Sequence, residues 1–409
     1  MSGEISAALF GALFYAGAAL AQDAGNSSYC VVPDGSPEAD ALASDGAAPD
    51  GAPPSGGVVA QDLATVQPAA RSTDGNETWG LGGHPILGYS PESRWTLGAG
   101  LALYYNPRPW DPAQRPDEYV LQATYTTRKQ GSLGLDSTTY LGGNRHFLQH
   151  KIKIVDTPSS FFGIGSNTPE SAEESYTQAG VGLDLAFQTM VREGLYLGPA
   201  VDFTYSRLYD ETPGGLLDRG AVIGAGTTRQ LGIGFLATYD STNSNLYKLR
   251  GSRVQLGGRI HHPWLGGSHA FWGASAEARH FVPLPWHMVL AFQLGARAAG
   301  GDVPFYDLEP LGGHRLLRGY SAERYIAKHF LGAQAELRYR LFWRFGGVFF
   351  LGAAEVEDHL RDFGSIVRAA GGLGFRFAIN RSQTINVRFD ITYNADGEAE
   401  KYIKLREAF

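Results

Sequence analysis

The sequence has little sulfur and no excess of basic residues. It contains one cysteine, Cys30, and three methionines in 409 residues, and its formal net charge is −7. A disulfide framework and a thiolate metal site each need at least two cysteines, so both are excluded. The missing positive charge excludes the electrostatic footprint of a nucleic-acid-binding protein. Beyond residue 20, no apolar run reaches the length of a transmembrane helix.

The negative charge belongs to one segment near the amino terminus. Between residues 22 and 76, eight acidic residues accompany one basic residue, whereas the chain from residue 77 onward carries 33 basic and 32 acidic residues. The segment consists largely of Asp, Ala, Gly, Pro and Ser. Such a composition buries too little apolar surface to offset the entropy lost on ordering. We therefore predict a disordered acidic linker over 22–76 and a folded domain over 77–409.

The chain opens with an apolar stretch. Residues 5–20 are uncharged and run into the small-x-small pattern Ala19-Leu20-Ala21, after which a signal peptidase can cut. Glu4 stands where an export signal normally has a basic residue. The alternative, a membrane-spanning helix, needs about 20 apolar residues, more than the stretch contains. The pattern favours export, with a signal peptide over 1–21.

Glycine and aromatic residues are abundant, with 54 Gly, 20 Tyr and 22 Phe. From about residue 82 to the end, apolar and polar residues alternate one by one, as in a strand with two unlike faces. From Leu331 to Arg338, for example, Leu and Ala alternate with Gly, Gln, Glu336 and Arg338. Sixteen runs fit this pattern: 82–90, 93–106, 117–128, 131–142, 147–155, 175–189, 195–207, 228–240, 250–262, 269–282, 286–299, 327–341, 345–356, 366–379, 383–394 and 399–409.

Two architectures alternate in this way, a soluble β-sandwich and a membrane β-barrel. Sandwich strands average about five or six residues, whereas these runs have about 10 to 14, enough to cross a bilayer at a tilt. Their polar faces carry charged residues in mid-strand, and aromatic residues crowd the strand ends. We predict an all-β fold, a 16-stranded antiparallel transmembrane β-barrel with a disordered N-terminal segment.

The connections between the predicted strands alternate in length. Short turns such as 192–194 and 343–344 alternate with long connections such as 208–227 and 300–326. In bacterial barrels short turns are periplasmic and long loops are extracellular. The pattern predicts a bacterial outer-membrane location with both termini in the periplasm.

The longest connection contains the sequence LGGHRLLRGY, which ends in Arg318-Gly319-Tyr320. This motif, with five predicted strands after it, resembles the tip of the sixth extracellular loop of the bacterial surface antigen superfamily, the BamA/TamA and two-partner-secretion barrels. The stretches PILGYSPESRWTLGAG, FFGIGSNTPE and AQAELRYRLF resemble the same family. The resemblance implies a barrel whose 300–326 loop folds into the lumen. It also implies insertion or translocation of proteins at the outer membrane, with unfolded proteins as clients.

The loop-lock motif of this resemblance comprises Arg318, Gly319, Tyr320 and Glu336. An arginine at a loop tip inside a low-dielectric lumen is costly unless it is paired, and the alternation places Glu336 on the luminal face. We predict an Arg318–Glu336 pair, with Gly319 allowing a close turn and Tyr320 packing on the wall. The alternative is that Arg318 lies in a solvated loop.

The sequence departs from the family at two points. Family members usually add an aspartate on the thirteenth strand to the motif, but Gly352 stands there, which makes Glu355 and Asp358 the candidate replacements. Family members that assemble or secrete proteins also carry periplasmic POTRA modules of about 75 residues, and the 22–76 segment has no room for one. The chain therefore resembles a short member that lacks POTRA domains.

The last predicted strand has the pattern of a barrel insertion signal. Ile403 and Leu405 are two residues apart, and the chain ends in Phe409. This matches the signal by which the outer-membrane barrel assembly machinery inserts barrels, although an ordinary closing strand has the same pattern. In the family, the first and last strands form a weak seam through which clients leave the barrel.

No enzymatic motif is found. None of the histidines has a motif spacing to a nucleophilic serine, and the neighbours His261 and His262 point to opposite faces of a strand. We predict no enzyme activity, no cofactor and no metal site. The expected partners are outer-membrane lipid, the barrel assembly machinery and possible unfolded protein clients, without nucleic acid. The alternative to insertion or translocation is a passive or structural barrel, or a pore plugged by the 300–326 loop.

Overall fold

The computed structural model describes residues 78–90, 94–105, 107–108, 117–242, 249–313, 316–380 and 385–405. The predicted signal peptide (1–21), the predicted linker (22–76) and Phe409 lie outside these ranges. Within the described residues, no helix is both long and apolar enough to span a membrane.

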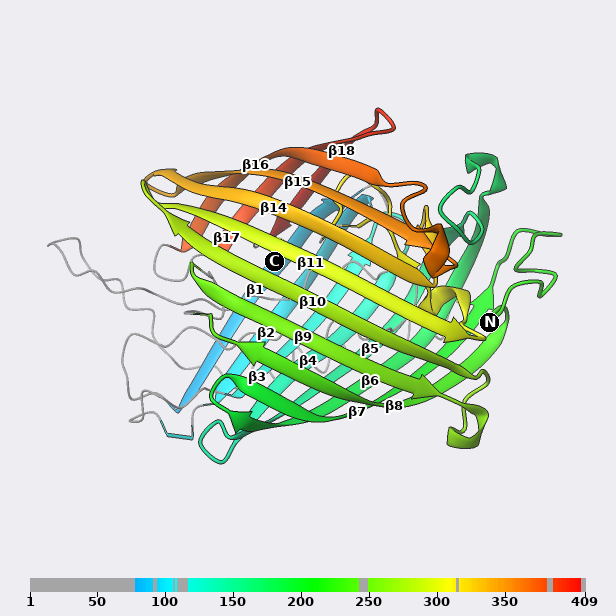
Figure 1. Cartoon of the computed structure of the whole chain (residues 1–409), viewed down its shortest axis with the longest axis horizontal. Coiled ribbons are helices and arrows are strands. Elements are labelled where there is room, and N and C mark those ends of the chain that lie inside the picture. The colour runs from blue at the N-terminus through cyan, green and yellow to red at the C-terminus, as the bar shows by residue number, and fades with distance from the viewer. Residues whose placement is uncertain are drawn as a thin grey trace, which may run out of the picture. The chain divides into compact units, whose positions relative to one another are not determined.

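Sixteen antiparallel strands form a closed barrel, as predicted (Figure 1). Each strand pairs with its neighbours in the chain, except that β11 pairs with β14 and β1 pairs with β18. The barrel strands are β1 (Trp79–Ser90), β2 (Arg94–Tyr105), β3 (Asp117–Thr126), β4 (Gly131–Leu141), β5 (His146–Phe161), β6 (Glu174–Arg192), β7 (Leu195–Tyr209), β8 (Thr227–Asp240), β9 (Gly251–His261), β10 (Phe271–Leu284), β11 (Met288–Gly301), β14 (His329–Phe342), β15 (Phe345–Glu357), β16 (Arg368–Asn380), β17 (Ile385–Asn394) and β18 (Ala399–Leu405).

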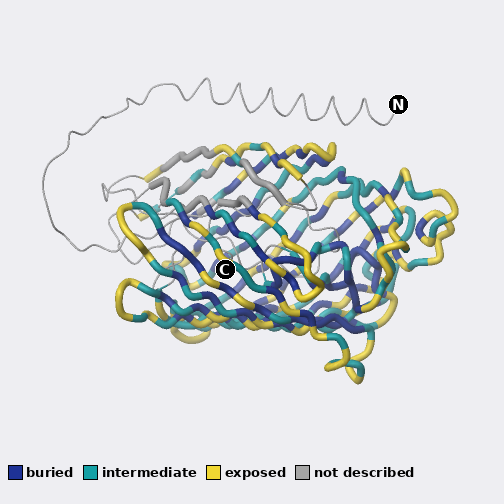
Figure 2. Tube along the Cα trace, turned by 90° about the horizontal axis from the view of Figure 1, so that it is seen from above, coloured by how far each residue is buried: buried dark blue, intermediate teal, exposed yellow. Residues whose placement is uncertain are grey.

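The barrel has the inside-out pattern of a membrane protein. Along the strands, buried and exposed positions alternate (Figure 2). On β14, Gln334, Glu336 and Arg338 are buried toward the lumen, whereas Leu331 is exposed. The exposed face is apolar because it meets lipid, and the charged groups of the strands lie inside, where they pair with one another.

Several strands are longer than the alternation predicts. The β5–β6 pairing continues to Phe161 opposite Glu174, although the predicted strands were 147–155 and 175–189. An apolar cluster holds the ends of these two strands. Phe161 and Tyr176 pack there against Phe305 from the loop between β11 and β14. Periodicity predicts strands that have two unlike faces and so misses these extensions.

We call residues 302–328 between β11 and β14 the long loop. It folds back on itself, because β12 (Glu309–Pro310) pairs with β13 (Ile326–Ala327). Within the described residues, four 3-10 turns lie outside the strands, including η3 (Phe305–Asp307) in the long loop. The short strands and 3-10 turns were not predicted, since segments of two or three residues carry no periodic signal. The even strand number places the start of β1 and the end of β18 at the same end of the barrel.

Candidate docking site of the long loop

The tip of the long loop carries its arginine into the barrel interior. The Arg318 side chain is fully buried, with 0% of its surface exposed. Its Nη2 donates to Glu336 on β14, and its Nη1 donates to Asp390 on β17 at 2.9 Å. The guanidinium also lies 3.6 Å from the ring centroid of Phe350 on β15. One arginine thus contacts three strands, and its charge is met by two carboxylates and an aromatic face.

Both carboxylates have further arginine partners on the barrel wall. Arg338 Nη2 lies 2.9 Å from Glu336 Oε2, and Arg376 Nη1 lies 2.6 Å from Asp390 Oδ1. The Nε of Arg388 is 3.7 Å from Asp390. We call Arg318, Glu336, Asp390 and Phe350 the docking site. Its acids lie within a network of wall arginines, which holds each carboxylate in a fixed orientation.

Gly319 and Tyr320 complete the contact between the loop tip and the wall. The Gly319 N–H donates to the Tyr402 hydroxyl at 3.1 Å, and the Asn394 Nδ2 donates to the Gly319 carbonyl at 2.8 Å. Gly319 has φ of +114°, and a Cβ there would lie 3.2 Å from the Cβ of Ala370, so a larger residue would be strained and crowded. Tyr320 is buried, and burial together with the charge of Asp396 raises its pKa to about 12. Tyr320 therefore stays neutral at physiological pH.

Apolar side chains extend the docking contact on both sides of Arg318. Leu311, Leu317 and Tyr320 from the long loop pack with Phe330 of β14 and Val356 of β15. Burying side chains of this size stabilises the docked loop by about 1.5–3 kcal/mol each, before the entropy of ordering the loop is counted. The docked state thus rests on apolar burial as well as on the arginine.

The structure corrects the expected replacement for the missing aspartate. Neither Glu355 nor Asp358 contacts Arg318. Glu355 instead accepts the backbone N–H groups of Gly364 and Ser365 at 2.8 and 3.0 Å. The second carboxylate comes from Asp390, two strands further along the sheet. Asp390 lies on the polar face of the alternating run 383–394, but no local pattern reveals which luminal side chains meet across a barrel.

Gly352 has a steric reason to lack a side chain. A Cβ at this position would lie 3.1 Å from the Ala333 carbonyl oxygen and 3.3 Å from the carbonyl oxygen of Leu316 in the long loop. The loop backbone therefore passes close to β15 at the position where the family usually has an aspartate. In this chain the second acid of the docking site is Asp390, and the loop backbone occupies the space next to Gly352.

The terminal residues of the predicted insertion signal are only partly within the described chain. Ile403 lies on β18 opposite Phe389 of β17, and its backbone also pairs with Tyr89 of β1. Leu405 pairs with Val387. Phe409 is outside the described residues. Tyr89–Ile403 is the pair that joins the first and last strands in the described part of the chain.

A second charged cluster, missed by the sequence analysis, lies on the luminal wall formed by β6, β7 and β9. Arg259 Nη1 donates to Asp184 at 2.7 Å and to Asp202 at 2.8 Å, and the Nε2 of His261 lies 2.8 Å from Asp202. The available signal was a charged residue on the polar face of each of three predicted strands. In the residues that the structure covers, no group of three or more His, Cys, Asp or Glu side chains could hold a metal ion.

Comparison with known proteins agrees with this architecture. Residues 115–405 match the Omp85 superfamily domain. Among solved structures, BamA from Haemophilus ducreyi lacking POTRA domains 1–3 is similar over 83% of this chain and 71% of that chain, with a TM-score of 0.54 and 15% identity. CdiB from Escherichia coli is similar over 82% of this chain and 64% of that one, with a TM-score of 0.57 and 12% identity.

CdiB from Acinetobacter baumannii is similar over 82% of this chain and 60% of that one, with a TM-score of 0.52 and 11% identity. The chain thus spans less than two thirds of either CdiB chain. No curated protein matches the sequence significantly. Omp85 barrels are non-enzymatic transport or assembly proteins of the outer membrane, which agrees with the prediction that this chain is not an enzyme. The extent of the domain match shows that the chain belongs to the Omp85 superfamily.

Proposed function

We propose that this barrel inserts proteins into the outer membrane or translocates them across it, with the long loop docked in the lumen as part of the working structure. The observation that carries the proposal is the fully buried Arg318, held by Glu336 and Asp390 from two different strands. Removing the charge of an arginine from water is costly unless carboxylates pair with it. The buried and paired Arg318 therefore favours a docked loop over a solvated one. The superfamily and the BamA and CdiB structures support the same class of function.

The proposal includes an arrangement of the chain in the cell. A signal peptide over 1–21 exports the protein, the acidic segment 22–76 is a periplasmic linker, and both termini are periplasmic. Ile403, Leu405 and Phe409 form the signal read by the outer-membrane barrel assembly machinery. The partners are then outer-membrane lipid on the exposed apolar face, that machinery during biogenesis, and unfolded proteins as clients.

Reconstitution in liposomes tests the function. The full-length protein should accelerate the folding of an added, unfolded outer-membrane barrel relative to protein-free liposomes. Arg318→Ala should abolish most of the acceleration, because its loop tip loses both carboxylate contacts. Arg361→Ala is the matched control, since the Arg361 side chain is 80% exposed. Equal rates with wild-type protein, the Arg318 variant and empty liposomes would refute the proposal.

A pore plugged by the long loop is the second candidate function. It is favoured by the apolar cluster in which Val303, Phe305, Tyr306 and Leu308 of the loop pack against β5–β7 and against Leu217 of the loop between β7 and β8. Deleting residues 305–322 should raise steady ion conductance in planar bilayers if the loop is a plug. Conductance that rises on deletion, without any client folding by the wild-type protein, would favour this function over insertion.

A further inference from the structure

The long loop has a second contact with the wall, separate from the contact that Arg318 makes. Within η3, Tyr306 hydrogen-bonds through its hydroxyl to Thr228 of β8, and the Phe305 N–H donates to the Ile223 carbonyl at 2.8 Å. These bonds and the packing of Phe305 fix the position of the next residue, Asp307. Its side chain is thereby directed to the wall with only 4% of the residue exposed.

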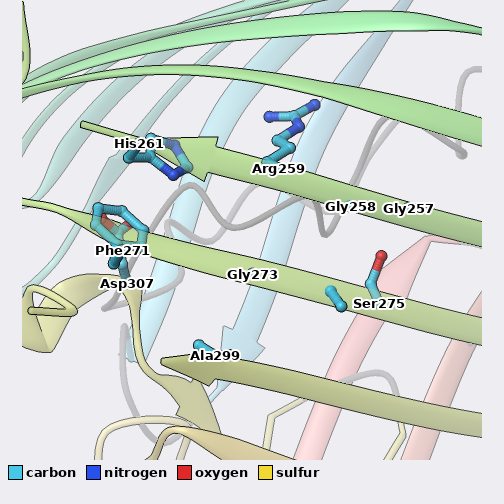
Figure 3. Close-up of a pocket in the computed structure, with 10 residues that line it drawn as sticks. Gly257, Gly258, Arg259, His261, Phe271, Gly273, Ser275, Ala299 and Asp307 are labelled. Carbon is cyan, nitrogen blue, oxygen red and sulfur yellow. The ribbon is translucent and has the colours of Figure 1, made fainter. Parts of the chain in front are cut away.

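Asp307 lines a small cavity together with Arg259, His261 and Phe271 (Figure 3). The cavity has a volume of about 20 Å³, enough for a single water molecule. His261 stacks on Phe271, with ring centroids 4.1 Å apart. In the described part of the chain, the Asp307 carboxyl forms no ion pair. Arg259 binds Asp184 and Asp202 through Nη1, and His261 binds Asp202 through Nε2.

The acidic groups around Asp307 disfavour its charged form. Asp184 of β6, Asp202 of β7 and Glu309 of the loop itself all act on it. Burial is the largest cause, and these three carboxylates add to it, so the pKa of Asp307 is raised well above the usual range of an aspartate.

Each basic group near this site pairs with another acid, and none of them forms an ion pair with Asp307 among the described residues. Arg259 and His261 bind the wall aspartates, and Arg297 of β11 lies 3.7 Å from Glu309 and 3.9 Å from Glu277 of β10. An ionised Asp307 would therefore add a buried negative charge without a partner of its own. A protonated Asp307 is neutral and fits the same place at much lower cost.

We propose that Asp307 is a proton-binding site that latches the first half of the long loop to the wall. Docking takes up one proton on the carboxyl, and loss of that proton favours release of the η3 segment. The inference rests on the proposed role of the docked loop and adds a proton as its ligand. Release at the Asp307 end does not require breaking the Arg318 contacts, which lie on different strands.

The direction of the pH effect follows from proton linkage. In the released loop, Asp307 is a solvated aspartate with a pKa of about 3.9. Between that pH and the raised folded-state pKa, the released form is ionised while the docked form keeps its proton. Docking is then weakened tenfold for each pH unit, and it is unaffected by this group outside that window.

Hydrogen–deuterium exchange of the purified full-length protein in lipid, without any client, tests the latch. Protection factors of the peptide covering 303–311, corrected for intrinsic exchange rates, should fall up to tenfold per pH unit as pH rises from 5. In Asp307→Asn they should be high and independent of pH, because the amide mimics the neutral acid. Asp302→Asn, an exposed acid of the same loop, is the matched control and should follow the wild-type profile.

Two results would overturn the latch: a flat wild-type profile between pH 5 and 9, or an Asp307→Asn profile equal to that of the wild type. If Asp307→Asn does not fold, Glu309→Gln replaces it. Without the Glu309 charge, the pKa of the docked Asp307 should be lower, so the protection factors should stop falling at a lower pH than in the wild type. A pH profile equal to that of the wild type would count against the latch. Because no client is present, a failed insertion assay with an intact pH profile refutes only the proposed function.

Discussion

Arg318 binds through three separate features of one guanidinium. Nη1 and Nη2 each reach a different carboxylate, and the plane of the group faces Phe350. A lysine has the same charge, but its ammonium is a compact group that cannot span two acids and stack on a ring at once. The geometry of the side chain, and not only its charge, therefore anchors the loop tip.

Arg318→Lys should therefore release the loop tip, although lysine carries the same charge as arginine. We expect a loss of about 1.5–3 kcal/mol in docking free energy, the range for a hydrogen bond to a charged group. Cleavage of the long loop by a protease that cuts after aromatic residues should become at least about tenfold faster, since 1.4 kcal/mol corresponds to tenfold. Arg361→Lys on the exposed 358–367 loop is the control. Wild-type cleavage of Arg318→Lys would show that charge alone suffices.

At the scale of strands, the alternation carried most of the predictive information. It placed Glu336 on the luminal face of the strand beginning near residue 327, and the structure brings it to Arg318. It did not select Asp390 over Glu355 as the second acid, because that choice depends on which strands the loop tip reaches inside a curved sheet. The cluster around Arg259 was missed for the same reason, since its members come from β6, β7 and β9.

The close approach of the long loop to β15 makes Gly352 sensitive to any side chain. Gly352→Ala would crowd the Leu316 carbonyl and should loosen the loop, and Gly352→Asp should loosen it further by placing a carboxylate against that oxygen. Thermal unfolding and loop proteolysis in detergent measure both effects. Gly134→Ala is the control, because the nearest atom to its new Cβ is 3.9 Å away. Tighter docking in Gly352→Asp would mean that the position still accepts the acid usual in the family.

At the scale of the whole molecule, the exposed side chains of the barrel face two different solvents, lipid and water. Leu351 in the middle of β15 and Leu360 in the 358–367 loop are almost equally exposed, at 68% and 65%. Their surroundings differ, because lipid covers the strand and water covers the loop. The exposed fraction of a side chain therefore does not predict which substitutions are tolerated at that position in this protein.

Leu351→Arg should destabilise the folded barrel by about 2–4 kcal/mol in lipid vesicles, the cost of an arginine near the bilayer midplane. Leu360→Arg should have little effect, because its side chain remains in water. Unfolding by denaturant, followed by the shift of the folded barrel on unheated gels, measures both variants. Equal stability of the two would mean that β15 does not face lipid.

The arginines around the docking site also determine what happens when the loop leaves. Arg338 and Arg376 pair with Glu336 and Asp390 through contacts that do not involve the loop, so we expect both carboxylates to keep a partner when Arg318 leaves. We therefore expect the wall side of the docking site to keep its shape without the loop, so that rebinding needs no rearrangement of the strands. The entropy of ordering falls on the loop alone. Loop composition and length, rather than repacking of the wall, should then set the rate at which a released loop docks again.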